Sequence, residues 1–140
     1  MGTMDPMGTI HREIIVDADP DAVWDALRDF GAVHERLVPG FVTAARLDGR
    51  DRIVTFFNGA VARELLVTLD DEARRLVWSV AESPMGMVHH NAATQVFPAG
   101  GGRTRFVWVT DVLPDEAVPR IAELMDRALP AIARTLGSAS

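Results

Sequence analysis

The chain has 140 residues, the size of one domain, and 48% of them are hydrophobic, which is enough for a buried core. A net charge of −6 argues against a general binder of nucleic acid or of anionic membranes. The absence of cysteine excludes a disulfide framework, a thiolate nucleophile and a cysteine-based metal site. All 14 basic residues are arginine, so Schiff-base chemistry on a lysine is excluded as well.

No apolar run approaches the length of a transmembrane helix, and no signal-peptide pattern is present. We therefore expect a cytoplasmic protein with no stable membrane insertion. Residues 1–9 contain three methionines, two glycines and a proline, and they are typical of a disordered leader or an expression remnant. The sequence thus predicts a single domain over residues 10–137.

The first elements are a strand over 10–16 and a helix that begins at Asp19-Pro20, where aspartate caps the helix and proline suits its first turn. We expect Gly31 to end that helix and a second short helix to follow over 32–37. Tight turns, among them the hairpin signal Asn58-Gly59, then separate six further strands. These strands are predicted over 41–47, 52–57, 61–69, 75–81, 87–97 and 103–112.

An apolar stripe at helical spacing predicts a long last helix that begins near 115–119 and ends at about Leu136, before Gly137. Pro130 lies inside it and is expected to kink it, because proline removes a backbone hydrogen bond. Strands joined by short links pair as antiparallel neighbours. The predicted fold is therefore α+β, with a curved antiparallel seven-stranded sheet wrapped around the last helix and two short helices after the first strand. Such a sheet tends to leave a ligand-sized cavity beside the helix.

This arrangement resembles the START-like, or Bet v 1-like, superfamily (SRPBCC), and within it the polyketide cyclase/dehydrase and lipid-transport group. The residues that carry the resemblance are Ile14-Ile15-Val16-Asp17-Ala18-Asp19-Pro20 with Val23-Trp24-Asp25-Ala26-Leu27, Arg63-Glu64-Leu65-Leu66 with Leu69-Asp70-Asp71, Glu82-Ser83-Pro84-Met85, and Gly101-Gly102-Arg103-Thr104-Arg105-Phe106-Val107-Trp108.

The resemblance implies the helix-grip fold and a hydrophobic small molecule bound between the sheet and the long helix. Some members of the superfamily cyclise polyketides, and others carry lipids or sterols. The plant hormone receptors of the superfamily use a long gate loop, whereas the tight Asn58-Gly59 turn leaves no room for one. A gate-and-latch receptor is therefore not expected.

Strand periodicity identifies the side chains that face the predicted cavity, since alternate residues of a strand share a face. On the strand over 87–97 this parity turns His90 inward and His89 outward. The aromatic face of the last strand, which carries Trp108, is also expected to point inward. The predicted ligand-binding residues are Phe57, Arg63, Trp78, Met87, His90, Trp108, Met125 and Leu129.

His90 is the candidate polar anchor of this pocket, with Arg63 or the neighbouring Glu64 near the mouth. The alternative is a core or rim histidine that is hydrogen-bonded to the backbone. His89 and His90 point to opposite faces of a strand, so they do not form a metal site. The glycine run 100–102 lacks the strand-to-helix context of a phosphate loop. The sequence therefore predicts no metal and no cofactor.

Three functional hypotheses follow. The first is a binding module for a lipid or a polyketide-like metabolite. The second is an enzyme of the cyclase/dehydrase type in which His90 moves a proton. The third is an interaction protein, such as a homodimer, whose cavity is filled by Trp78, Trp108, Met125 and Leu129.

Overall fold

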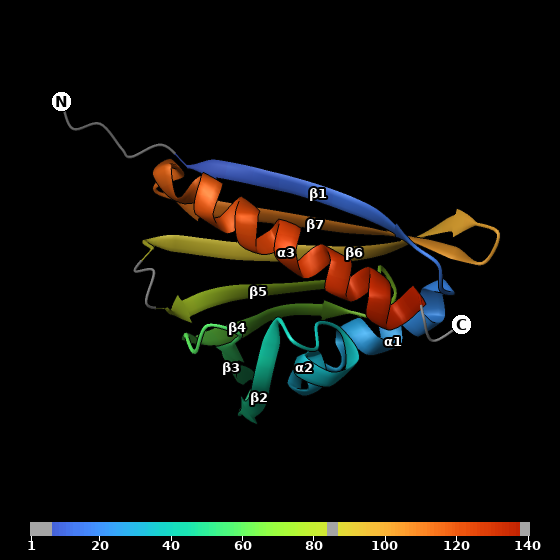
Figure 1. The fold of residues 1–140 in the computed structure, drawn as a ribbon, viewed down its shortest axis with the longest axis horizontal. Helices are drawn as coiled ribbons and strands as arrows, with labels where there is room; N and C mark the ends of the chain where they lie inside the picture. Colours follow the sequence, from blue (N-terminus) through green and yellow to red (C-terminus); the bar gives the residue numbers. More distant parts are fainter. Residues whose placement is uncertain (1–6, 84–86, 138–140) are drawn as a thin grey trace.

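A computed structural model describes residues 7–83 and 87–137 of the chain. Its seven strands form one sheet in the order β1-β7-β6-β5-β4-β3-β2, and all neighbouring strands are antiparallel (Figure 1). The strands are β1 Gly8–Val16, β2 Val42–Asp48, β3 Asp51–Phe56, β4 Val61–Asp70, β5 Arg75–Glu82, β6 His89–Gly100 and β7 Arg103–Leu113.

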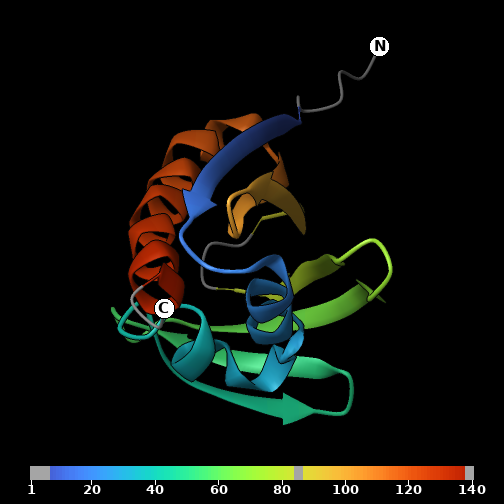
Figure 2. The ribbon, with the colours of Figure 1, turned by 90° about the vertical axis from the view of Figure 1, so that its right-hand side faces the viewer.

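The long helix α3 runs across one face of this sheet, while α1 and α2 lie together at one end (Figures 1 and 2). The helices are α1 Pro20–Arg28, α2 Val33–Arg36 and α3 Val118–Gly137, with 3-10 turns η1 Phe30–Ala32 and η2 Asp115–Ala117. Figure 2 shows the sheet curving around the helix. The predicted helix-grip architecture is confirmed. None of the helices in the described ranges is long and apolar enough to cross a membrane.

The start of α1 follows its local sequence. The Asp19 side chain accepts a hydrogen bond from the backbone N–H of Asp21 at 2.9 Å, and Pro20 occupies the first turn. The predicted end of the helix is wrong, because α1 ends at Arg28 and Gly31 lies in η1. A Cβ atom at Gly31 would lie 2.8 Å from the Leu47 side chain, so close packing explains the glycine.

Three predicted strand boundaries are also wrong, among them the start of β6, which lies at His89 and not at residue 87. β1 begins at Gly8, so Gly8 and Thr9 belong to the domain and the boundary at residue 10 lies too late. Residues 1–6 of the predicted leader lie outside the described residues. β6 continues past Pro98 to Gly100, because an irregularity between these two residues accommodates the proline in a pair with β7.

The core divides into two clusters beneath α3. The larger contains the buried faces of α1 and of the second half of α3, including Ala128 and Ile132. The smaller joins Ile10 of β1 and Val112 of β7 to Ile121 and Met125 in the first half of α3. Pro130 lies inside α3, and the kink at that position stays a prediction.

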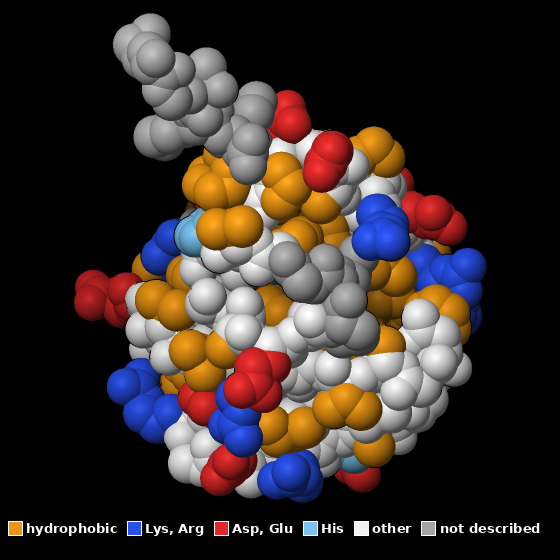
Figure 3. Space-filling view, turned by 90° about the vertical axis from the view of Figure 1, so that its left-hand side faces the viewer, with side chains coloured by type: hydrophobic (Ala, Val, Ile, Leu, Met, Phe, Trp, Pro, Cys, Tyr) orange, Lys and Arg blue, Asp and Glu red, His pale blue; other side chains and the backbone are white. Residues whose placement is uncertain are grey.

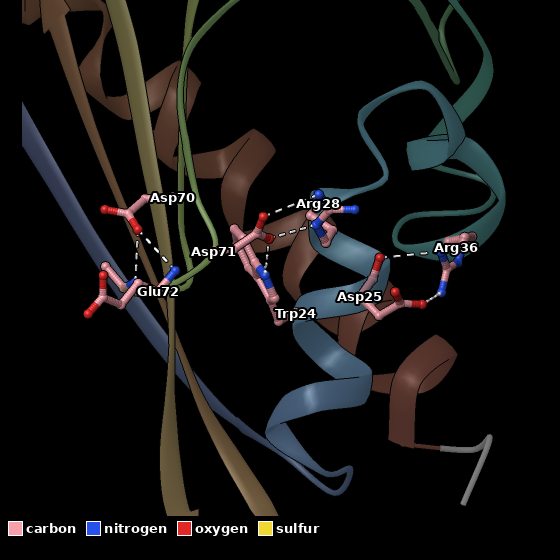
Figure 4. Close-up of polar contacts among 8 residues, drawn as sticks. Trp24, Asp25, Arg28, Arg36, Asp70, Asp71 and Glu72 are labelled. Atoms are coloured by element: carbon pink, nitrogen blue, oxygen red, sulfur yellow. Dashed lines mark hydrogen bonds and ion pairs between the residues drawn. The ribbon is translucent and has the colours of Figure 1, made fainter.

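A side-chain clamp fastens α1 to the turn after β4 (Figure 4). Trp24 donates its indole N–H to Asp71 at 2.9 Å, and Arg28 donates Nε–H to the same carboxylate at 2.8 Å. These hydrogen bonds, that of Arg28 first, lower the pKa of Asp71 below its ordinary value. Beside the clamp, Arg36 of α2 donates to Asp25 of α1 at 2.6 Å (Figure 4). The clamp therefore holds α1 against the turn that joins β4 to β5.

We expect Asp71→Ala to lower the free energy of unfolding at neutral pH, because Trp24 and Arg28 lose a shared acceptor. A carboxylate whose pKa is depressed in the folded state stabilises the fold above its unfolded pKa and loses that effect as pH falls through the folded pKa. The difference from the unmodified protein should therefore shrink in acid. Urea unfolding followed by circular dichroism measures it, with the exposed neighbour Glu72→Ala as the control. Equal effects of the two substitutions would contradict the clamp.

Candidate functional site

A pocket of about 460 Å³ lies between the first half of α3 and the ends of strands β3 to β6. These chain segments meet at the end of the molecule that faces the viewer in Figure 3, where hydrophobic side chains gather and charged side chains of both signs lie around them. The pocket is lined by Phe56, Phe57, Asn58, Ala60, Ala62, Glu64, Val80, Ser83, His90, Arg120, Ile121, Glu123, Leu124 and Arg127.

The only carboxylate that reaches the pocket from the sheet, among its described lining residues, belongs to Glu64. The residue is only 7% exposed, and its Oε1 accepts a hydrogen bond from Nε of Arg52 at 2.7 Å. Arg52 is itself only 4% exposed. Removing both charges from water is costly, so a buried pair persists only with good geometry and further hydrogen bonds.

Arg52 obtains those further contacts from two elements, η1 and β5. Its Nη1 donates to the carbonyl oxygen of Phe30 at 3.2 Å. The guanidinium also stacks on two aromatic rings, 3.9 Å from the centroid of Phe30 and 4.9 Å from that of Trp78. Arg52 thus holds Glu64 Oε1 in place, while the other carboxylate oxygen accepts no hydrogen bond from the described part of the chain.

A smaller recess of about 60 Å³ adjoins the pocket through shared residues. Phe56 and Glu64 line both spaces, and Trp108 lines only the recess. The indole Nε1 of Trp108 and the hydroxyl of Thr110, which is 1% exposed, are buried without a hydrogen-bond partner among the described residues. The inward face of β7 therefore carries polar groups that are not satisfied by the protein itself.

His90, near the start of β6, presents a neutral imidazole to the pocket. Burial, with a smaller contribution from the neighbouring His89, lowers the pKa of His90 to about 4. Its Nδ1 is buried and has no hydrogen-bond partner among the described residues. At neutral pH the ring can donate or accept one hydrogen bond but carries no charge.

The rim of the pocket is charged. Arg120, Glu123 and Arg127 line it from α3, within two helical turns of one another. The guanidinium of Arg127 lies 4.5 Å from the ring centroid of Phe57, which follows β3. This cation–π contact joins the helix to the β3–β4 loop across the mouth.

The structure separates the residues expected at the site. Phe57 and His90 line the pocket, and Trp108 lines the recess. Three residues, Trp78, Met125 and Leu129, are buried in the core, and Met87 packs against the smaller cluster. On β6 the predicted parity is confirmed, since Ala92, Thr94 and Val96 are buried and His89 is exposed.

Arg63 is not at the mouth, so its predicted position is wrong. It lies on the outer face of β4, where its guanidinium donates to Asp48 and Asp51 at 2.8 Å each. Its neighbours Ala62 and Glu64 are the buried ones. Because β4 carries apolar residues on both faces, parity alone could not choose between the faces.

Sequence reasoning missed Arg52 entirely. A two-residue turn at Asn58-Gly59 would place Arg52 opposite Leu65. Instead Phe56 donates its N–H to the carbonyl of Ala60 at 2.8 Å, which closes a three-residue loop, and Arg52 pairs directly with Glu64. A one-residue change of register moves every side chain to the opposite face.

Comparison with known proteins identifies relatives of this architecture. The family model described as "Polyketide cyclase / dehydrase and lipid transport" matches residues 7–137. No curated protein matches the chain by sequence. Among solved structures, an uncharacterised protein of Bacillus thuringiensis is similar with a TM-score of 0.84 at 17% identity, covering 92% of this chain and 98% of that chain.

Two further structures share the fold. Norcoclaurine synthase of Thalictrum flavum, solved with dopamine and hydroxybenzaldehyde, has a TM-score of 0.74 at 21% identity, covering 96% of this chain and 86% of that chain. A START superfamily protein of Mycobacterium smegmatis has a TM-score of 0.72 at 13% identity, covering 94% and 95% of the two chains.

In the described part of the chain, no cluster of three or more His, Cys, Asp or Glu residues is placed to hold a metal ion.

We expect Arg52→Met to destabilise the fold by about 3–5 kcal/mol, because Glu64 is left as an unpaired buried charge. Replacing both partners, in Arg52→Met/Glu64→Leu, should restore most of that loss, since the buried charge is then absent. Urea unfolding of the single and double variants measures the coupling. Additive losses in the double variant would show that the pair does not act as a unit.

His90 should make stability depend on pH. Its folded pKa of about 4 lies below its ordinary value of 6.5, so the unfolded chain binds the proton more readily between these values. Stability should fall as pH drops through this window, by roughly 3 kcal/mol in total, and should be regained in His90→Phe relative to the unmodified protein. Urea unfolding across the window measures this effect, with His11→Gln at an exposed histidine as the control. A His90 ring resonance that titrates near its ordinary value would contradict the assignment.

Proposed function

Because the chain belongs to the polyketide cyclase/dehydrase and lipid transport family of the START-like superfamily, we propose that it binds a hydrophobic or amphipathic small molecule in the pocket beside α3. The observation that carries the proposal is the pocket itself, about 460 Å³ in volume, with predominantly apolar walls and a few convergent polar groups. This combination is typical of small-molecule sites. A lipid or a polyketide-like metabolite fits the description.

The polar groups of the pocket support a ligand with at least one hydrogen-bonding atom. Glu64 offers a carboxylate oxygen that Arg52 leaves free, and His90 offers an uncharged ring nitrogen. The norcoclaurine synthase structure, which holds dopamine and hydroxybenzaldehyde, is an example of this fold with small aromatic molecules bound. Small-molecule binding therefore has a precedent in this fold. The 21% identity supports similarity of the fold and nothing further.

The alternative is a cyclase/dehydrase-type enzyme in which His90 moves a proton. Its support is the family description and the position of His90 in the pocket wall. A pKa of about 4 makes His90 a weak base near neutral pH, and within the described residues no carboxylate is hydrogen-bonded to its ring. Both observations favour binding over turnover. His90→Phe should keep ligand binding in a carrier, whereas a cyclase that uses this ring should lose turnover by about two orders of magnitude or more.

The third hypothesis, an interaction protein with a filled cavity, has less support. Trp78, Met125 and Leu129 do fill the centre of the fold, yet the pocket remains beside them. A homodimer and a cytoplasmic location stay predictions from the sequence.

Native mass spectrometry of the purified protein tests the proposal first, since a bound metabolite adds mass that denaturation removes. Phenylnaphthylamine, an uncharged apolar fluorophore, tests the empty pocket. We expect it to bind with enhanced fluorescence and to lose at least tenfold in affinity in Ala62→Phe, which places a ring in the pocket wall. Leu124→Phe makes a smaller addition from the helix side.

The matched control is Ala44→Phe, the same replacement at an exposed alanine of β2. It should leave phenylnaphthylamine affinity unchanged. Absence of any bound molecule, together with equal fluorophore affinity in all folded variants, would contradict a ligand site at this pocket.

A further inference from the structure

Two arginines at the mouth of the pocket have no carboxylate partner among the described residues. Arg120 and Arg127 form no ion pair with any described residue, and the contact recorded for Arg127 is the ring of Phe57. The chain has 20 acidic residues for 14 arginines, so partners are abundant. Six other arginines at the surface do use them, as Arg12 does with Asp126 at 2.7 Å. What sets Arg120 and Arg127 apart is their place at the mouth of an apolar pocket.

From this arrangement we propose that the ligand is an amphipathic organic anion, whose apolar body enters the pocket and whose anionic head lies between Arg120 and Arg127. The inference rests on the proposed ligand-binding function and names the chemical class of the ligand. Both arginines are exposed, so their charges stay in water at the rim while the apolar walls below take the body. The two arginines at the rim and the apolar walls below them together suit one molecule with an anionic end and an apolar end.

The other charges around the pocket agree with an anion at the rim and not deeper. Glu64 is neutralised by Arg52, so the pair gives no net positive charge that could hold an anionic head inside the pocket. His90 is uncharged at neutral pH and gives no cation for a buried anionic head. Glu123 is the single acidic residue among the pocket-lining residues of α3, and it lies one turn from each arginine without forming an ion pair with either. The rim therefore keeps a net positive charge.

A pair of fluorophores that differ in one group tests the inference. Anilinonaphthalene sulfonate has the aromatic skeleton of phenylnaphthylamine plus an anionic sulfonate. We expect Arg120→Gln and Arg127→Gln each to weaken sulfonate binding by roughly three- to fivefold, as is typical of exposed charge pairs, and the double variant by about tenfold or more. Phenylnaphthylamine affinity should change by less than about twofold in the same variants, since it carries no charge.

Three further measurements separate a specific head site from a general charge effect. Glu123→Gln should strengthen sulfonate binding, and Arg127→Lys should restore it relative to Arg127→Gln, because each change raises the positive charge of the rim. Added salt should weaken the sulfonate and spare the uncharged fluorophore. Arg75→Gln is the matched control, because Arg75 is exposed at the opposite end of β5 and has no ion-pair partner among the described residues.

The outcomes distinguish this inference from the proposed function. If phenylnaphthylamine binds in the pocket but the arginine variants leave the sulfonate affinity unchanged, or Arg75→Gln weakens it equally, then the anionic-head site is wrong and the apolar pocket stands. If neither fluorophore responds to Ala62→Phe, the ligand-binding function itself fails.

Discussion

The buried ion pair between Arg52 and Glu64 connects the fold to the pocket. Its hydrogen bond of 2.7 Å joins β3 to β4, and the same guanidinium reaches the backbone of η1 and the ring of Trp78 on β5. Four segments therefore depend on one side chain. Such a pair contributes little to stability compared with an apolar replacement, but it penalises any packing in which the partners separate. The pair therefore holds these four segments in contact with one another.

The same ion pair also fixes the position of a polar group in the pocket lining. Glu64 lines both the pocket and the recess behind it, so a fixed carboxylate marks the border between them. In the recess, the indole N–H of Trp108 has no hydrogen-bond partner among the described residues. The site therefore has a charged rim, mostly apolar walls and a few polar groups. Under the proposed function, a ligand with matching polar and apolar parts gains contacts with each of them.

Much of the fold could be predicted because its signals are local. Asp19-Pro20 identifies the start of α1, alternation along β6 identifies His90 as inward, and Asn58-Gly59 identifies a hairpin. The site could not be predicted in the same way, because it depends on contacts between residues far apart in the sequence. The hairpin closes with three loop residues, which sets Arg52 against Glu64 across the sheet, and the arginines of α3 reach the pocket only through tertiary packing. Periodicity reports which residues share a face, but not which of two apolar faces is covered.

The division of α3 between two clusters has a consequence for how such proteins diversify. Its second half supplies Ala128 and Ile132 to the main core, whereas its first half serves both the smaller cluster, through Ile121 and Met125, and the pocket, which Arg120 and Glu123 line. All of the α3 side chains that line the pocket lie in this first half. An exposed lining residue such as Glu123 can therefore change with a new ligand while the buried core stays the same. The ligand preference of a protein with this fold can thus change in evolution before its buried core does.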